Sequence, residues 1–140
     1  MNIRIVYHSQ TGNTKKIAEA IAGEVHCIAE PITVIKSPVF ADILFIGAAV
    51  YATYDHGIDP VVKNFINQLD TSKVGRAVLF CTGFSRKAIV MMSEILLQKR
   101  IKVHEKHFYC KGKLFLIFNF GHPNAKDITD AKRFAKEIAS

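Results

Sequence analysis

The residues best suited to chemistry near the start of the chain are the short hydroxyl side chains and the single glycine of the segment 9–14. An apolar run at residues 3–6 precedes this segment, and apolar residues at offsets of three and four follow it from Ile17 onward. This order predicts a strand, a tight loop and the start of a helix. The first amides of a helix have no carbonyl partner within it, and the helix dipole favours an anion there. The segment therefore has the chemistry of a phosphate site, with these candidate residues: Ser9, Gln10, Thr11, Gly12, Asn13 and Thr14.

The absence of two known motifs limits the kind of phosphate group that the segment is expected to bind. The G-x-x-x-x-G-K-[ST] loop of nucleoside-triphosphate sites does not occur, and the segment has one glycine where a dinucleotide fingerprint has three. A loop without a fixed cation suits one terminal phosphomonoester better than a metal-bound polyphosphate. A second interpretation of the same residues stays open, namely an ordinary helix start in which Thr11 or Asn13 only caps the amides.

The rest of the chain alternates between strand and helix patterns. Continuous apolar runs at 42–48 and 77–81 are typical of strands buried on both faces of a parallel sheet. Further strands are expected at 3–6, 32–35 and 102–110, and helices are expected to begin near residues 15, 60, 86 and 127. This alternation predicts one α/β domain, residues 1–140, with a doubly wound sheet in three layers and helices on both faces. The apolar segment 114–120 fits neither pattern clearly.

Three loops are expected at one edge of this sheet. Parallel strands end at the same edge, and ligands of doubly wound sheets bind beyond it. The loops are 8–14, 48–57 and 82–87, and all three are rich in glycine, hydroxyl or aromatic residues. Tyr51 and Tyr54 are natural platforms for a planar ring. The same tyrosines would also suit a lid packed against the protein's own surface.

The segment 9–14 resembles the [ST]-x-T-G-x-T loop with which flavodoxins wrap the phosphate of flavin mononucleotide (FMN). Strings at 108–113, 121–124, 127–128 and 131–135 are also similar to those of short flavodoxin-like proteins, so the resemblance covers nearly the whole chain. It implies a five-stranded parallel sheet in the order 2-1-3-4-5, and FMN as the cofactor. It further implies that the flavin ring lies between the second and third loops, against Ala49, Val50, Tyr51, Ala52, Thr53, Tyr54, Gly57, Thr82, Gly83 and Phe84.

Two features depart from the flavodoxin pattern. The chain has no tryptophan, so Tyr51 or Tyr54 must take the place of the family's usual Trp in the second loop. Flavodoxins are typically strongly acidic, whereas this chain has a net charge of +7. The family's usual electron-transfer partners therefore do not follow from the resemblance.

The positive charge is concentrated in the second half of the chain. Residues 1–70 carry five basic and seven acidic side chains, a net charge of −2, and residues 71–140 carry fourteen and five, a net charge of +9. The densest stretch contains Lys99, Arg100, Lys102, Lys106, Lys111 and Lys113. It is either a docking patch for an acidic redox partner or a solvated face whose lysines prevent edge-to-edge strand pairing. No binding-module signature points to nucleic acid.

Several other classes are set aside. No apolar run approaches the roughly 20 residues that span a bilayer, and the first residues lack a signal-peptide layout, so we expect a cytoplasmic protein. Three cysteines without C-x-x-C spacing indicate neither a disulfide framework nor a zinc site. Four residues separate Cys81 from Arg86, one fewer than in the C-x5-R phosphatase loop. His104 and His107 would face opposite sides of a strand, and no metal site is expected.

Three classes of function follow. The leading one is a small electron carrier that binds FMN, serves redox partner proteins and has no catalytic residues of its own. The second is an enzyme on the same fold, either an FMN-dependent NAD(P)H:quinone or flavin reductase or a protoporphyrinogen-oxidase-like enzyme, although the long insertion expected of that oxidase is absent. The third is a flavin-free binding module. Reduction in one-electron steps would favour the carrier, and direct reduction by NADPH would favour the enzyme.

Overall fold

Five parallel strands form one sheet in the computed structural model, which describes residues 1–51, 57–111 and 123–140 (for Tyr51, the backbone alone). Along the sheet the strand order is β2-β1-β3-β6-β7. Counted among themselves in chain order, these strands give the order 2-1-3-4-5, so the predicted order is confirmed. Their bounds are β1 Ile3–Tyr7, β2 Ala29–Pro31, β3 Ala41–Ala48, β6 Val74–Thr82 and β7 Phe108–Cys110.

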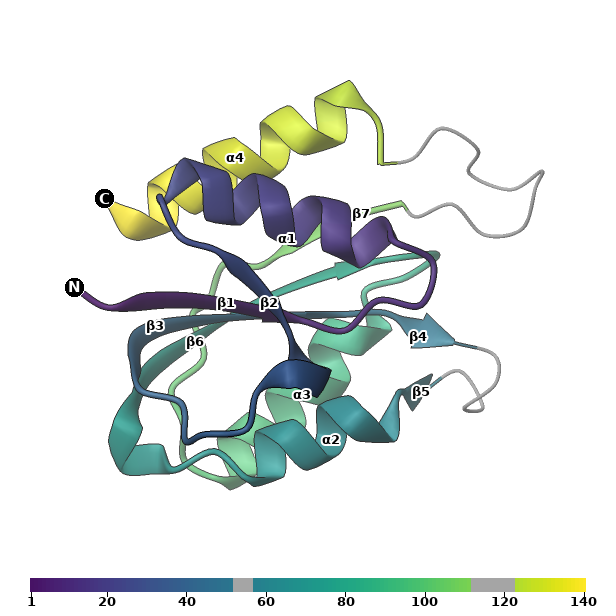
Figure 1. The fold of residues 1–140 in the computed structure, drawn as a ribbon. Coiled ribbons are helices and arrows are strands. Elements are labelled where there is room, and N and C mark those ends of the chain that lie inside the picture. The colour runs from purple at the N-terminus through teal and green to yellow at the C-terminus, as the bar shows by residue number, and fades with distance from the viewer. Residues whose placement is uncertain (52–56, 112–122) are drawn as a thin grey trace.

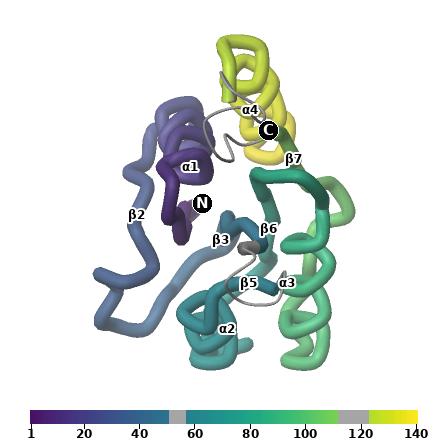
Figure 2. Tube along the Cα trace, turned by 90° about the vertical axis from the view of Figure 1, so that its right-hand side faces the viewer, coloured from purple at the N-terminus to yellow at the C-terminus, as the bar shows by residue number. Residues whose placement is uncertain are grey.

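Helices cover both faces of the sheet, which confirms the predicted three layers. Helix α1 (Asn13–Glu24) and helix α4 (Ala125–Ala139) lie on one face, and helix α2 (Pro60–Asn67) and helix α3 (Lys87–Gln98) lie on the other (Figures 1 and 2). All four helices begin at the edge where the strands end, because each runs antiparallel to the sheet. The elements therefore direct their helix N-termini and strand ends toward one side of the molecule.

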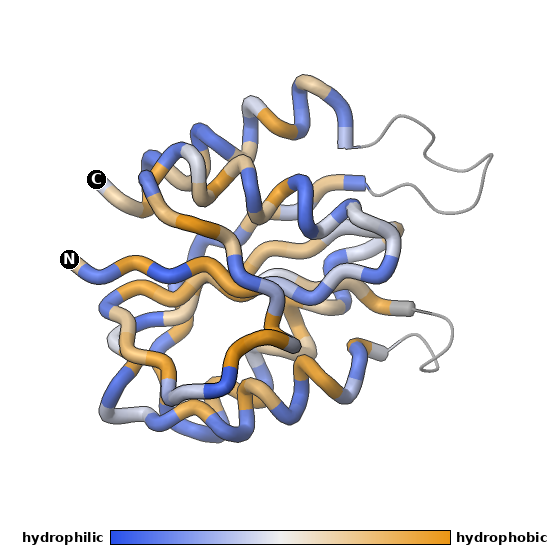
Figure 3. Tube along the Cα trace, viewed as in Figure 1, coloured by the Kyte–Doolittle hydropathy of each residue, from blue (hydrophilic) through white to orange (hydrophobic). Residues whose placement is uncertain are grey.

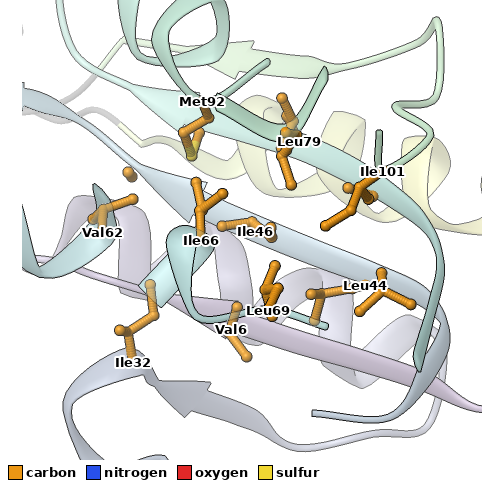
Figure 4. Close-up of a cluster of buried hydrophobic side chains, with 14 of the residues drawn as sticks. Val6, Ile32, Leu44, Ile46, Val62, Ile66, Leu69, Leu79, Met92 and Ile101 are labelled. Carbon is orange, nitrogen blue, oxygen red and sulfur yellow. The ribbon is translucent and has the colours of Figure 1, made fainter. Parts of the chain in front are cut away.

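The central strands β3 and β6 consist largely of hydrophobic residues (Figure 3). They bury side chains on both faces, as their apolar runs predict. Residues such as Phe45 and Phe80 pack under α1 and α4. Their sequence neighbours Ile46 and Leu79 face the other way and pack with Val62, Ile66 and Met92 of α2 and α3 (Figure 4). Apolar burial on both sides holds the sheet between the helices.

The prediction of a strand at residues 32–35 is wrong. The edge strand β2 covers residues 29–31, and Ile32–Val34 forms a short 3-10 helix. Pro31 ends the strand because it has no amide to donate. Only Ile32 of the following turn is buried. The strand is fixed at its middle residue, where Glu30 accepts three hydrogen bonds from the Arg4 guanidinium at 2.9 to 3.1 Å.

The last strand is shorter than the expected 102–110. Between residues 102 and 107, the described backbone pairs with the sheet at an isolated bridge between Ala77 and Val103. The backbone then turns at His104, whose Nδ1 accepts a hydrogen bond from the Lys106 amide at 3.0 Å. This local bond takes the chain out of the ladder until residue 108.

Helix bounds differ from the expectations by a few residues. Helix α4 begins at Ala125 rather than Asp127, because Asn124 and Asp127 form a reciprocal capping box. Helix α2 begins at Pro60 as expected, and α3 begins one residue after the expected start. The ambiguous segment 114–120 lies outside the described residues. Within the described ranges, no helix has both the length and the apolar character to cross a membrane.

Two of the three cysteines are chemically sheltered. Burial raises the pKa of the Cys81 thiol and that of the Cys110 thiol from 9.0 to about 12. These residues belong to the two different core clusters on opposite faces of the sheet. Cys27 is half-buried.

In a thiol titration with Ellman's reagent at pH 8, we expect only Cys27 to react in the native protein, and all three cysteines to react after unfolding. Because folding raises the pKa of the two buried thiols, their contribution to stability is complete below about pH 9 and decreases as the pH rises toward 12. A Cys27→Ser variant should show no fast-reacting thiol. Native reactivity of two thiols would contradict the burial described here.

Candidate functional site

The first loop leaves an open position at the start of α1. Gly12 is the N-cap residue, with φ +89, and no atom lies within 4 Å of the place where its Cβ would be. Its amide donates to Ser9 Oγ at 3.0 Å, and its carbonyl accepts the first helical bond from Lys16 N at 3.1 Å. The capping position is thus held by a residue with no side chain, and not by Thr11 or Asn13. Such a start leaves room for a ligand to approach the helix amides.

A buried pair of hydroxyls joins the first loop to the third. Thr14 Oγ1 lies 2.9 Å from Thr82 Oγ1, and the two residues are 1 % and 2 % exposed. In a hydroxyl pair one group donates and the other accepts. When Thr82 donates, the Thr14 proton is not used within the pair and can be donated to a third group.

The third loop is fixed by β7. Gly83, at φ +123, donates its amide to Cys110 O at 3.2 Å, and its carbonyl accepts from the Tyr109 hydroxyl at 2.6 Å. The Arg86 guanidinium lies 4.8 Å above the centre of the Tyr109 ring. The pKa of Tyr109 is raised, chiefly because burial disfavours the phenolate, so the phenol remains a donor to the loop. The predicted site residue Phe84 is 60 % exposed next to this anchored turn.

The second predicted loop is partly a β-hairpin. Strand β3 includes Ala48, and a short antiparallel pair follows, β4 Val50–Tyr51 and β5 Gly57–Ile58. The pairs Val50–Ile58 and Tyr51–Gly57 set its register. Ala49 is buried beside the sheet. The predicted ring-binding residues Ala52, Thr53 and Tyr54 lie outside the described residues, as does the side chain of Tyr51.

A hydrogen-bonded pair that the sequence did not reveal links the first loop to α2. His8 Nε2 lies 2.9 Å from Asp59 Oδ2, and the two side chains are 16 % and 10 % exposed. The second carboxylate oxygen, Oδ1, accepts from Val61 N at 2.9 Å and caps α2. The position of an Asp directly before Pro60 is a recognisable capping signal. Nothing in the sequence indicates that His8 would meet it.

Substitutions at Asp59 separate its two roles. We expect Asp59→Asn to retain the helix cap and lose the carboxylate that faces His8, and Asp59→Ala to lose both the cap and the contact with His8. Since a capping residue contributes about 1 kcal/mol, the alanine variant should be less stable than the asparagine variant by that amount. Urea denaturation of both variants measures the difference. Equal stabilities would show that the cap contributes nothing.

The geometry suits binding of an anion better than hydrolysis of one. Cys81 donates its Sγ proton to Ser85 O at 3.7 Å, and a thiol with a pKa of about 12 is not a nucleophile near neutral pH. Nor do the described ranges, which omit 52–56 and 112–122, contain a group of three or more His, Cys, Asp or Glu side chains able to hold a metal ion. What the described loops offer is a helix start, hydroxyls and fixed backbone groups.

Comparison with known proteins gives one family. Residues 4–116 match the model of the flavodoxin domain family. An uncharacterized protein of Methanocaldococcus jannaschii is 28% identical over 150 residues, covering 99% of this chain and 98% of that protein.

Solved flavodoxins have the same fold. A flavodoxin from the domain Archaea superposes with a TM-score of 0.80 at 20% identity, covering 99% of this chain and 96% of that one. A mutant of Fusobacterium nucleatum flavodoxin, bound to FMN, superposes with a TM-score of 0.64 at 15% identity, covering 97% and 95%. Both likenesses extend over nearly the full length of the two chains compared.

Proposed function

This chain belongs to the flavodoxin family, and from that premise we propose that it binds FMN and carries electrons between redox partner proteins. The proposal includes a cytoplasmic location and a single domain over residues 1–140. FMN is the cofactor of the family, and bound FMN supplies one- and two-electron redox chemistry that amino-acid side chains do not have. The chain's own task is to bind the flavin and to set its orientation and its access to solvent.

The observation that supports the proposal best is the start of α1. Gly12 occupies the N-cap position in a left-handed conformation, with open space beside it. The buried Thr14 hydroxyl is hydrogen-bonded to the Thr82 hydroxyl. A terminal phosphate fits this arrangement, because the helix amides and hydroxyls all donate hydrogen bonds. We assign the phosphate of FMN to the segment 9–14.

The flavin ring is assigned to the space between the second and third loops. Gly83 and Phe84 follow the end of β6, and the hairpin β4–β5 follows the end of β3. The anchors from Tyr109 and Cys110 hold the third loop in one position, which favours a rigid wall for a planar ring. The ring contacts from the second loop are proposed from the sequence: Ala49, Val50, Tyr51, Ala52, Thr53, Tyr54 and Gly57.

A flavin titration tests the proposal. Purified protein, freed of bound flavin, is titrated with FMN and with riboflavin while flavin fluorescence is followed. We expect FMN to bind more tightly than riboflavin, because only FMN carries the phosphate. No quenching by either flavin would overturn the assignment of the cofactor.

Reduction of the loaded protein then separates a carrier from an enzyme. Stepwise photoreduction should pass through a one-electron stage, and NADPH alone should not reduce the flavin at a catalytic rate. Rapid reduction by NADPH would instead favour a reductase on the same fold.

A further inference from the structure

Cations surround the edge of the sheet at which the proposed flavin site lies. Helices α1, α2 and α3 have no acidic residue in their first turns. Exposed basic side chains stand instead at these helix starts and directly after β7, and we call them the basic rim: Lys15, Lys16, Lys63, Arg86, Lys87 and Lys111. Because positive charge at a helix N-terminus opposes the helix dipole, this placement becomes favourable when an anionic group lies opposite.

The acidic side chains described at this edge do not neutralise the basic rim. They are Asp59 and Asp127, in the part of the chain that excludes 52–56 and 112–122. One turn further along α1, Glu19 Oε1 lies 3.9 Å from Nζ of the rim residue Lys15 and offsets that one charge. Asp59 is 7 % exposed and bonded to His8 and to the start of α2. Asp127 belongs to the capping box of α4. The surface charge of the described edge is therefore positive.

An apolar side chain lies within this charged border. Phe84 is 60 % exposed, and it stands between the end of β6 and the cations that begin α3. Figure 2 views the molecule from this side, with α1, β7 and α3 around the ends of the central strands. A large apolar group within a polar border is the usual composition of a protein docking surface.

We propose that the basic rim docks a redox protein whose own electron-transfer face is acidic. The inference rests on the proposed FMN function for its purpose, because a partner docked here would approach the flavin. Opposite charges on the two faces would accelerate the encounter and fix the orientation of the complex. One electron would pass from reduced FMN to the partner's oxidised centre, and no covalent bond would form or break.

Most of the densest basic stretch of the sequence, which begins at Lys99, lies away from the edge that carries the basic rim. Lys102 pairs by its carbonyl with Ala77, near the start of β6, and Arg76 lies beside it. Lys99 donates its Nζ to Asn67 O at 2.8 Å, and Lys106 lies 3.9 Å from Glu137. Lys113 lies outside the described residues, and of the described members of that stretch Lys111 alone belongs to the basic rim. The group around Arg76 and Lys102 therefore provides a control of equal charge away from the flavin edge.

The test uses two forms of one redox protein. Horse heart cytochrome c is basic, and its succinylated form is acidic while keeping the same haem. Binding of each to the oxidised protein is measured by isothermal titration calorimetry at an ionic strength of about 10 mM, with and without FMN. Stopped-flow then measures the reduction of ferric to ferrous haem by the FMN-loaded, reduced protein.

We expect the succinylated form to bind and to be reduced at least about 10-fold better than the native form, with an advantage that decreases in salt. The double variant Lys87→Glu/Lys111→Glu should abolish this preference, and it leaves the Arg86–Tyr109 contact intact. The matched variant Arg76→Glu/Lys102→Glu, with the same change of net charge, should retain it.

Three results would overturn the inference: a preference for native cytochrome c, equal binding of both forms, or an equal loss in both double variants. The last would show that overall charge is responsible, and not the basic rim. Because calorimetry also works on the flavin-free chain, a failure of FMN to bind would overturn the proposed function and leave the docking test valid.

Discussion

Replacing Gly47 with alanine is expected to destabilise the protein by about 3 kcal/mol, the upper part of the range for overpacking a core. A Cβ at this position would lie 2.0 Å from Cε2 and 2.2 Å from Cζ of the Phe80 ring. Phe80 is fully buried and pairs with Gly47 across the central strands. The added methyl group must displace a ring that has no free space, or force the two strands apart.

The same glycine also supports the first loop. Its carbonyl accepts the His8 amide at 3.0 Å, so a shift of β3 at this point moves the residue that leads into the phosphate segment. We therefore expect Gly47→Ala to weaken FMN binding in addition to stability. Urea denaturation and the flavin titration measure the two effects separately.

Two variants control for the change of residue type. Gly23→Ala makes the identical substitution near the end of α1, where nothing lies within 4 Å of the new Cβ, and should stabilise by up to about 1 kcal/mol through helix propensity. Combining Gly47→Ala with Phe80→Leu should cost less than the sum of the two single changes, since the smaller side chain makes room. Additive effects would show that the Phe80 ring is not the obstacle.

The parts of the fold that the sequence predicts are those in which one physical signal dominates. The runs at 42–48 and 77–81 are apolar without interruption, and only a strand covered on both faces makes use of that pattern. Pro60 identifies the start of α2 because its fixed φ and missing amide suit that position. In these places local pattern and tertiary packing require the same structure.

The expectations fail where a local hydrogen bond or a distant contact decides. Thr33, Val34 and Ile35 have strand-forming side chains, yet the chain forms a 3-10 turn after Pro31. The bond from Lys106 N to His104 keeps the residues between Val103 and Phe108 out of the strand ladder. The pair formed by His8 and Asp59 joins residues 51 positions apart. Propensity carries no information about a contact of that kind.

Replacing Thr14 with valine is expected to reduce FMN affinity about 10- to 100-fold, the range for losing a hydrogen bond to a charged group. Valine has nearly the shape of threonine, so the packing of this 1 % exposed residue changes little. Riboflavin has no phosphate, and its affinity should remain close to that of the unmodified protein. Fluorescence titration with both flavins gives the ratio of their affinities, which measures the contribution of the phosphate to binding.

The two neighbouring hydroxyl variants separate a direct contact from a structural effect. Thr14→Ser restores the hydroxyl and should restore the preference for FMN. Thr82→Val removes the partner at 2.9 Å but leaves the Thr14 proton free to donate, so its loss should be smaller than that of Thr14→Val. If Thr14→Val weakens FMN and riboflavin by the same factor, Thr14 acts through the shape of the loop, and the assignment of its hydroxyl to the phosphate is wrong. A loss confined to FMN would mean that the hydroxyl acts on the phosphate itself, because the ring and the ribityl chain are common to both ligands.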